Sequence, residues 1–137
     1  MSRYKEVLLV DDNEADHFIS RRIMQKVDLA ENYVEVYNGE EALEYVRSGG
    51  PGGAPGQAEL IFLDINMPRM NGWEFVDEFR RLPPELQTAR IVMMLTTSNN
   101  DQDRAKAREA GVIKSFINKP LTVESLEACL AADEFDA

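Results

Sequence analysis

The sequence has little of what disulfide-bonded, metal-cluster or membrane proteins need. Its 137 residues include one cysteine, Cys129, and one histidine, His17. A single thiol excludes an intramolecular disulfide and a cysteine metal cluster. No apolar run approaches the length of a membrane-spanning helix, and Val7–Val10 is too short for the core of a signal peptide. We therefore expect a cytoplasmic protein that is not embedded in a membrane.

Positive charge is scarce as well. The 15 Lys and Arg residues face 25 Asp and Glu residues, for a formal net charge of −10. A field of this sign repels phosphate backbones, so we expect no direct nucleic-acid binding, whereas cations and basic protein surfaces suit it. The length and the hydrophobic fraction of 44% are ordinary for one globular domain. We expect that domain to occupy residues 1–137, with its core over about 6–131.

Short apolar runs alternate with segments of helical periodicity. The predicted strands are Val7–Val10, Tyr33–Val36, Leu60–Leu63, Ile91–Leu95 and Ser115–Asn118, and the predicted helices are Ala15–Val27, Glu40–Arg47, Gly72–Leu82, Asp101–Ala110 and Thr122–Ala131. This alternation predicts a doubly wound α/β domain whose parallel sheet is covered by helices on both faces. In such sheets the ligand crevice lies beyond the carboxyl ends of the strands.

Several other features favour purely structural interpretations. Residues 48–57 are rich in Gly and Pro without the Gly-Lys-Ser/Thr of a phosphate-binding loop, which predicts a flexible surface loop. Residues 132–137 form an acidic tail that we expect to be frayed. For single residues, we expect His17 at a solvated or partly packed helix position, Trp73 on the core-facing stripe of its helix, and Cys129 at a packed helix position. The first helix takes its apolar periodicity from Phe18, Ile19, Ile23 and Val27.

Polar side chains follow four of the predicted strands. They are Asp11 and Asp12, then Asp64, then Thr96 and Thr97, and finally Lys119 before Pro120. Three carboxylates at one edge of a sheet repel one another unless a cation or an ammonium group compensates, and oxygen ligands favour a hard ion such as Mg²⁺. Carboxylates also act as nucleophiles that form aspartyl-phosphates. The set is therefore suited to hold a phosphoryl group on one aspartate.

These residues resemble the receiver domain of two-component response regulators. The resemblance rests on Asp11-Asp12, on Asp64 within "LDINMPRMNG", on Thr96 and on Lys119-Pro120, each after a predicted strand, and it covers about Glu6 to Ala131. It implies a flavodoxin-like, CheY-like fold with five parallel strands in the order 2-1-3-4-5. It also implies a single-domain regulator in a phosphorelay, which accepts a phosphoryl group from a sensor histidine kinase.

The resemblance implies a role for each matching polar residue. Asp64 is expected to be the phospho-acceptor, and Lys119 to pair with Asp64 and later with a phosphoryl oxygen. Mg²⁺ is expected to bind Asp12, Asp64 and the backbone carbonyl of Asn66, with Asp11 supporting the ion through water or charge.

The resemblance also implies a switch. Thr96 is expected to donate to a phosphoryl oxygen, although the neighbouring Thr97 leaves this hydroxyl ambiguous by one position. Phe116 is expected to be the aromatic switch residue. The segment from Gly111 to Lys119 is one residue longer than is usual in the family, and we expect the loop before the fifth strand to absorb the extra residue.

The expected partners are proteins. The kinase is expected to be of the phytochrome type, by analogy with small single-domain receivers. Because the chain ends soon after the fifth helix, we expect output through a downstream protein or a second copy, bound by the face of the fourth helix, fifth strand and fifth helix. We expect a phospho-acceptor that promotes its own phosphorylation and dephosphorylation, and not an enzyme.

Two alternatives stay open. One is a pseudo-receiver that binds partners without phosphorylation, although such chains usually lose a member of the acidic pocket or the lysine, and this sequence has both. The other is a hydrolase with an aspartyl-phosphate intermediate. Asp64-Ile65-Asn66 lacks the second acid of the Asp-x-Asp pattern of such hydrolases, which counts against this alternative.

Overall fold

The computed structural model describes residues 3–50, 53–95 and 101–131. Within these ranges the strands are β1 (Tyr4–Val10), β2 (Ala30–Val36), β3 (Leu60–Asp64), β4 (Arg90–Leu95) and β5 (Ile113–Asn118). The helices are α1 (Glu14–Lys26), α2 (Gly39–Ser48), α3 (Gly72–Arg80), α4 (Asp101–Ala110) and α5 (Val123–Ala131), with a short 3₁₀ helix, η1, at Pro84–Leu86. Every predicted strand and helix is present, and the differences lie at the ends. None of the helices in these ranges is both long and apolar enough to cross a membrane.

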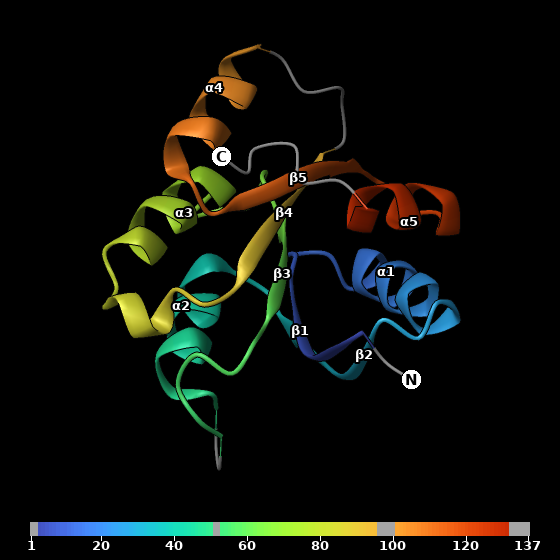
Figure 1. Ribbon diagram of the computed structural model, residues 1–137, viewed down its shortest axis with the longest axis horizontal. Helices are drawn as coiled ribbons and strands as arrows, with labels where there is room; N and C mark the ends of the chain where they lie inside the picture. Colours follow the sequence, from blue (N-terminus) through green and yellow to red (C-terminus); the bar gives the residue numbers. More distant parts are fainter. Residues whose placement is uncertain (1–2, 51–52, 96–100, 132–137) are drawn as a thin grey trace.

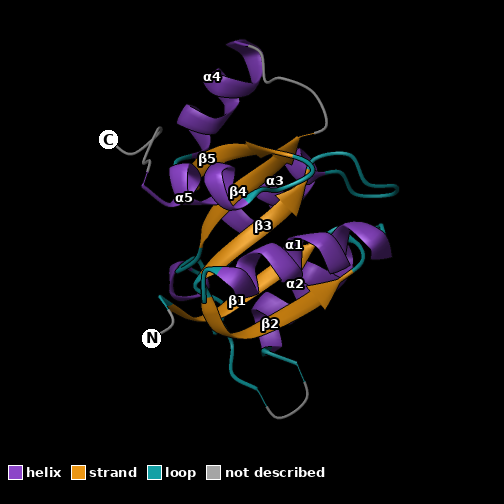
Figure 2. Ribbon diagram, turned by 90° about the vertical axis from the view of Figure 1, so that its right-hand side faces the viewer, coloured by secondary structure: helices purple, strands orange, loops and turns teal. Residues whose placement is uncertain are grey.

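The five strands form one parallel sheet in the order β2-β1-β3-β4-β5. Helices α1 and α5 cover one face of this sheet, and α2, α3 and α4 cover the other (Figures 1 and 2). The doubly wound fold predicted from the alternation is thus confirmed, and so is the strand order that the resemblance implies. Because the strands are parallel, their carboxyl ends meet at one edge of the sheet.

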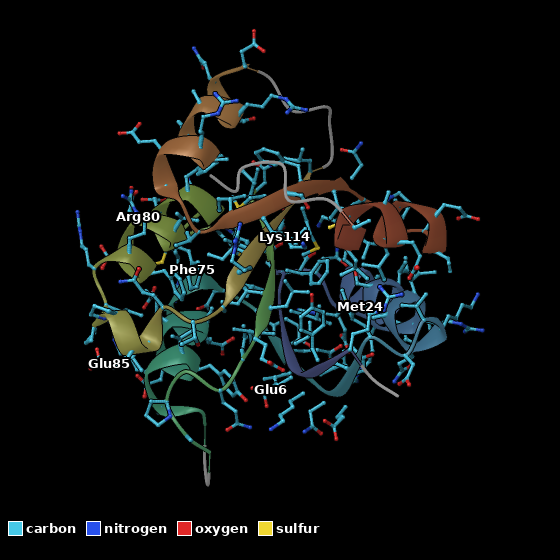
Figure 3. The ribbon with its side chains drawn as sticks, in the orientation of Figure 1. Glu6, Met24, Phe75, Arg80, Glu85 and Lys114 are labelled. Atoms are coloured by element: carbon cyan, nitrogen blue, oxygen red, sulfur yellow. The ribbon has the colours of Figure 1, made fainter. Side chains whose placement is uncertain are left out.

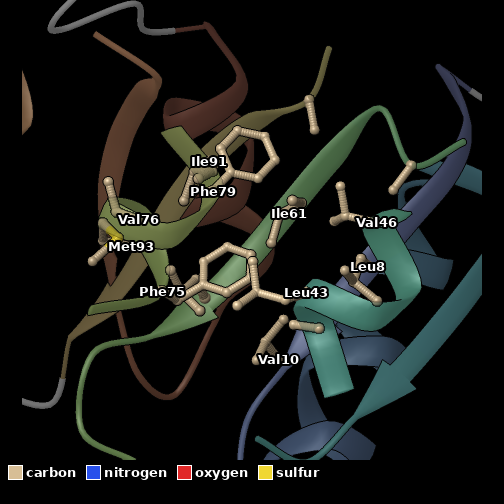
Figure 4. Packing of buried hydrophobic residues seen from close by; sticks show 14 of the residues in the cluster. Leu8, Val10, Leu43, Val46, Ile61, Phe75, Val76, Phe79, Ile91 and Met93 are labelled. Carbon is tan, nitrogen blue, oxygen red and sulfur yellow. The ribbon is translucent and has the colours of Figure 1, made fainter. Parts of the chain in front are cut away.

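The central strand β3 contributes to a separate core on each face of the sheet. Ile61 and Leu63 pack in the cluster under α2 and α3, while Leu60 and Phe62 pack in the cluster under α1 and α5. On the α3 side, the rings of Phe75 and Phe79 stack 5.9 Å apart beside Ile61 (Figure 4). Each buried aliphatic or aromatic side chain stabilises the fold by roughly 1.5–3 kcal/mol. Burial on both faces makes β3 a rigid support for whatever follows it.

Helix α1 buries only part of the apolar face that its periodicity indicates, since Ile23 and Val27 pack against the core whereas Phe18 and Ile19 are exposed. Its buried residues are His17, Ser20 and Met24, whereas Phe18 is 63% and Ile19 40% exposed. Figure 3 shows Met24 on the α1 side of the sheet, opposite Phe75. The expectation of a solvated or partly packed His17 was wrong, since this side chain is 2% exposed.

Hydrogen bonds of His17 explain the orientation of α1. Its Nε2 lies 2.9 Å from the carbonyl oxygen of Asp11 and 2.9 Å from that of Val36, so a protonated Nε2 donates to both. This contact fastens the first turns of α1 to the ends of β1 and β2. Successive helical residues point about 100° apart, so with His17 facing inward the side chain of Phe18 turns toward solvent.

Strand β5 contains an irregularity at Lys114. Ile91 of β4 pairs with Ile113, but the next residue, Val92, pairs with Ser115, so Lys114 forms a β-bulge. The residue that we expected in the preceding loop lies inside the strand instead. A bulge reorients the side chains that follow it. Beyond it Ile117 faces the α5 side and Phe116 packs against the α3 side.

Three smaller expectations concern Cys129, Trp73 and the Gly/Pro loop. Cys129 is buried with its Sγ 3.0 Å from Ser115 Oγ, which confirms a packed position. Trp73 is partly buried and packs against the cluster of buried residues on the α3 side of the sheet. Described loop residues form hydrogen bonds with the core, such as Gln57 Nε2 to Glu6 Oε1 at 2.9 Å. Flexibility of residues 48–57 stays a prediction, and the acidic tail lies outside the described residues.

Candidate functional site

The carboxyl ends of β1 and β3 bring the predicted acids together. Asp11 and Asp12 follow β1 and Asp64 is the last residue of β3, and one oxygen of each carboxylate lies within 4.8 Å of the other two. Asp11 and Asp64 are buried, 1% and 3% exposed, while Asp12 is exposed. These are the three carboxylates that the sequence places after strands one and three.

Lys119 arrives at the same cluster from the end of β5. Its Nζ lies 2.7 Å from Asp11 Oδ2, 2.8 Å from Asp16 Oδ2 and 3.5 Å from Asp64 Oδ2. The backbone N–H of Lys119 donates to Leu95 O at 2.7 Å, which ties this residue to the end of β4. The lysine therefore faces Asp64 as expected, but its shortest contacts are with Asp11 and Asp16.

Burial and charge set the protonation of this cluster. Burial raises the pKa of Asp64 to about 6; the ammonium group of Lys119 opposes this rise and the charge of Asp11 adds to it. Burial alone would lower the pKa of Lys119, but its hydrogen bonds to Asp11 and Asp16 outweigh burial and raise it. Lys119 is therefore a permanent cation, and Asp64 is a carboxylate at neutral pH with a pKa that a nearby cation would lower.

Local hydrogen bonds orient the two buried carboxylates. Asp64 Oδ1 accepts from the backbone N–H of Asn66 at 3.2 Å, and Asp11 Oδ1 accepts from that of Asn13 at 3.0 Å. In each case the side chain is held by the turn that follows its strand. The second oxygen of each carboxylate faces Lys119.

The loop after Asp64 turns back through a close backbone contact at Gly72. The N–H of Gly72 donates to Ile65 O at 2.8 Å. A Cβ at residue 72 would lie 2.8 Å from Ile65 Cα and 2.9 Å from Asp64 O, so only glycine fits there. Asn71 and Glu74 then begin α3 with a reciprocal capping box. The "MPRMNG" segment thus leads the chain from the end of β3 into α3, while Asp64 itself is 3% exposed.

The predicted switch residues have different outcomes. Phe116 is partly buried, and its ring contacts that of Trp73 edge to face, with centroids 6.4 Å apart. Lys106 of α4 places its Nζ 5.4 Å from the centroid of Trp73. Phe116 therefore lies where β5, α3 and α4 meet. Thr96 and Thr97 lie outside the described residues, so the threonine hydroxyl stays a prediction.

Asp16 is the site residue that the sequence interpretation missed. It lies in the first turn of α1, where an acid is common because it complements the helix dipole, and so it attracts no notice in the sequence. The signal in the sequence is its place soon after β1, four residues after Asp12 and three after the N-cap Asn13, which keeps it at the same edge of the sheet.

Comparison with known proteins identifies the family. The response regulator receiver domain matches residues 7–131. This chain belongs to the response regulator receiver family. It is 30% identical to the probable methanogenesis regulatory protein FilR2 of Methanothrix harundinacea over 121 residues, 88% of this chain and 76% of that protein.

Solved structures of receivers share the fold over nearly the whole chain. The bacteriophytochrome response regulator AtBRR superimposes with a TM-score of 0.74 and 27% identity over 94% of this chain and 91% of that one. A two-component response regulator from Cytophaga hutchinsonii superimposes with a TM-score of 0.78 and 26% identity over 96% of each chain. Two-component signalling by phosphorelay is therefore the general role of this receiver. Receivers generally bind Mg²⁺ in an acidic pocket, and the oxygen-only set of Asp11, Asp12 and Asp64 fits that ion.

Proposed function

We propose that this receiver accepts a phosphoryl group on Asp64 from a sensor histidine kinase. A carboxylate oxygen of Asp64 attacks the phosphorus of a phosphohistidine in line, the P–N bond breaks, and an aspartyl-phosphate forms. The observation that supports this role is the convergence of Asp64, Asp11 and Lys119 within hydrogen-bond or ion-pair distance at the carboxyl edge of the sheet.

We assign the ion site to Asp12, Asp64 and the backbone carbonyl of Asn66, with Asp11 acting through water or charge. When bound there, Mg²⁺ would neutralise charge on the transferring phosphoryl oxygens. One carboxylate oxygen of the exposed Asp12 and one of the buried Asp64 lie within 4.8 Å of each other, so the two can contribute ligands to one ion. Lys119 supplies the remaining positive charge, and its raised pKa keeps it protonated at every physiological pH.

Phosphorylation then changes partner contacts. In this proposal Thr96 donates to a phosphoryl oxygen, and Phe116 turns inward toward the space that the threonine leaves. Because Phe116 contacts Trp73 of α3, and Trp73 contacts Lys106 of α4, its movement would alter the face formed by α4, β5 and α5. The chain acts as a phospho-acceptor that promotes its own phosphorylation and dephosphorylation, without turnover of a separate substrate.

The test is phosphorylation by acetyl phosphate, followed by intact-protein mass spectrometry with Mg²⁺ or with a chelator. We expect the wild type to be labelled in Mg²⁺ only and Asp64→Asn to stay unlabelled. Asp77→Asn, which removes an exposed carboxylate from α3, is the matched control and should label like the wild type. Equal labelling of wild type and Asp64→Asn would refute the assignment.

The labelling experiment tests the pseudo-receiver alternative, and a hydrolysis assay tests the hydrolase alternative. A pseudo-receiver would show no labelling of any variant. A hydrolase would turn over p-nitrophenyl phosphate with a rate that depends on Asp64, whereas we expect no such turnover because Asn66 occupies the place of the second acid.

The kind of kinase is proposed from the comparisons. AtBRR is a bacteriophytochrome response regulator, and we propose a phytochrome-type histidine kinase as the donor for this chain. Phosphotransfer from purified phytochrome-type kinases, compared with kinases of other sensor classes at equal concentration, tests this assignment. Faster labelling by the other classes would contradict it.

The output partner is proposed to be a downstream protein or a second copy, bound through α4, β5 and α5. Within the described residues of α4, Gln102, Ala105 and Glu109 are exposed and can contact a partner. Light scattering coupled to size exclusion, with and without acetyl phosphate and Mg²⁺, should show a mass increase if the partner is a second copy.

A further inference from the structure

Asp16 forms an ion pair that the mechanism proposed above does not use. Its Oδ2 lies 2.8 Å from Lys119 Nζ, closer than the 3.5 Å between the same nitrogen and Asp64 Oδ2. The side chain of Lys119 is 10% exposed and that of Asp16 is 34% exposed, so this contact lies at the rim of the site. A lysine that must reach a phosphoryl group on Asp64 is thus held more closely by Asp11 and Asp16 than by Asp64 itself.

The start of α1 explains why Asp16 points toward Lys119. An acid three residues after the N-cap commonly accepts the N-cap N–H, as Glu74 Oε1 does from Asn71 N at 2.9 Å in α3. In α1 the N-cap is Asn13, but its N–H donates to Asp11 Oδ1 at 3.0 Å. Asn13 Oδ1 still accepts from Asp16 N at 3.0 Å. The half-formed capping box leaves the Asp16 carboxylate available to the lysine.

We propose that Asp16 is a positioning residue that competes with the phosphoryl group for Lys119. This inference rests on the proposed function of Asp64. In the structure Lys119 is shared between Asp11 and Asp16, and phosphorylation requires its ammonium group to exchange Asp16 for a phosphoryl oxygen. Asp16 therefore raises the free energy of the phosphorylated state relative to the unphosphorylated one, and it limits how completely a phosphoryl group captures the lysine.

The test measures the affinity for beryllofluoride, an anion that mimics a phosphoryl group on aspartate, by calorimetry in Mg²⁺. We expect Asp16→Asn to bind about three- to fivefold tighter than the wild type, near the upper limit that partly exposed ion pairs contribute. Glu14→Gln removes an equal charge from the same turn of α1 and is the matched control. It should change the affinity less than twofold. Asp16→Glu restores the carboxylate and should return the affinity toward that of the wild type.

Asp16→Asn should fold like the wild type, because the cap of α1 uses the backbone N–H of residue 16, which the substitution keeps. An affinity within twofold of the wild type, or a weaker one, would overturn the proposal. So would an equal gain in Glu14→Gln, since that result would indicate charge alone, or an Asp16→Glu that binds as tightly as Asp16→Asn. Acetyl phosphate labelling of the wild type distinguishes failure of the proposed function from failure of this inference. No labelling of the wild type refutes the proposed function. Labelling of the wild type, together with an unchanged beryllofluoride affinity in Asp16→Asn, refutes only the role of Asp16.

Discussion

At the scale of single residues, the site buries a charged carboxylate whose ionisation lowers the stability of the fold. Asp64 is 3% exposed and its carboxylate has a pKa raised to about 6 by burial, so ionising it costs folding free energy. Asp11 adds a second buried carboxylate beside it. Lys119 offsets part of this cost through contacts of 2.7 Å and 3.5 Å. The buried carboxylate that makes the site reactive thus also makes the metal-free protein less stable.

Asp64→Asn should stabilise the metal-free protein at neutral pH. The pKa of Asp64 rises from 3.8 to about 6 on folding, so between these values the folded state binds more protons and stability falls as the pH rises. Above about pH 6 the penalty is complete, and removing it should add about 1–3 kcal/mol to the free energy of unfolding. Below about pH 4 the two proteins should unfold alike, since the carboxyl group is protonated in both states.

Urea unfolding in a chelator, at a series of pH values, measures this difference. Asp77→Asn serves as the control, and its stability should follow that of the wild type at each pH because Asp77 is exposed. A wild type more stable than Asp64→Asn at pH 7 would contradict the sign of the effect.

At the scale of helices and loops, two helix starts with the same sequence pattern face different neighbours. Asn38-Gly39 begins α2 and Asn71-Gly72 begins α3, and in both the asparagine is the N-cap. A Cβ on Gly39 would meet the flexible side chain of Met70, at 2.7 Å from its Sδ. A Cβ on Gly72 would meet backbone atoms of Asp64 and Ile65. The backbone cannot move aside as a side chain can.

Gly72→Ala should therefore cost more stability than Gly39→Ala. We expect a loss of about 1–3 kcal/mol for Gly72→Ala, the usual cost of overpacking, and a smaller loss for Gly39→Ala. Gly72→Ala should also slow labelling by acetyl phosphate, because its Cβ pushes on the carbonyl of Asp64. Urea unfolding and mass spectrometry measure the two effects, and equal stability losses in the two variants would argue against this close contact.

Helix α1 provides a second comparison at this scale. Met24 is fully buried, whereas Phe18 is 63% exposed, although both are apolar residues of the same helix. Met24→Ala should cost about 2–5 kcal/mol in the free energy of unfolding. Phe18→Ala should change it by less than about 0.5 kcal/mol. Chemical unfolding of both variants tests the orientation of α1, and a reversed order would mean that the helix is rotated.

At the scale of the whole molecule, an aromatic contact between Phe116 and Trp73 links the strand that ends at the site to the proposed output face. The ring of Phe116 lies 6.4 Å from that of Trp73, which in turn packs under Lys106 of α4. The bulge at Lys114 sets the direction of Phe116 within β5. A change at the end of β5 can thus reach α3 and α4 without any movement of the sheet.

Fluorescence of Trp73, the single tryptophan, should report phosphorylation. If Phe116 turns inward, Trp73 loses an aromatic neighbour, and its emission should shift in intensity or wavelength on addition of beryllofluoride and Mg²⁺. Asp64→Asn should show no such change, and Phe116→Leu a smaller one. An unchanged emission from a protein that mass spectrometry shows to be phosphorylated by acetyl phosphate would mean that Phe116 stays in place.

The sheet of this receiver and the residues that meet at its edge can be predicted from the sequence. The alternation of apolar runs and helical segments predicts the doubly wound sheet, because each pattern is a local consequence of side-chain spacing. The place of Asp11, Asp12, Asp64 and Lys119 directly after strands predicts their meeting, because parallel strands end at one edge. These conclusions need only local chemistry and chain order.

Only the tertiary structure decided which groups touch. The burial of His17, the outward face of Phe18, the bulge at Lys114 and the contact of Asp16 with Lys119 all depend on how helices rotate and strands register against one another. These choices arise from competition among many packing and hydrogen-bonding contacts, and residues far apart in the chain supply the partners. The sequence by itself determined which chemistry gathers at the edge of the sheet, while the packing determined which carboxylates hold the lysine there.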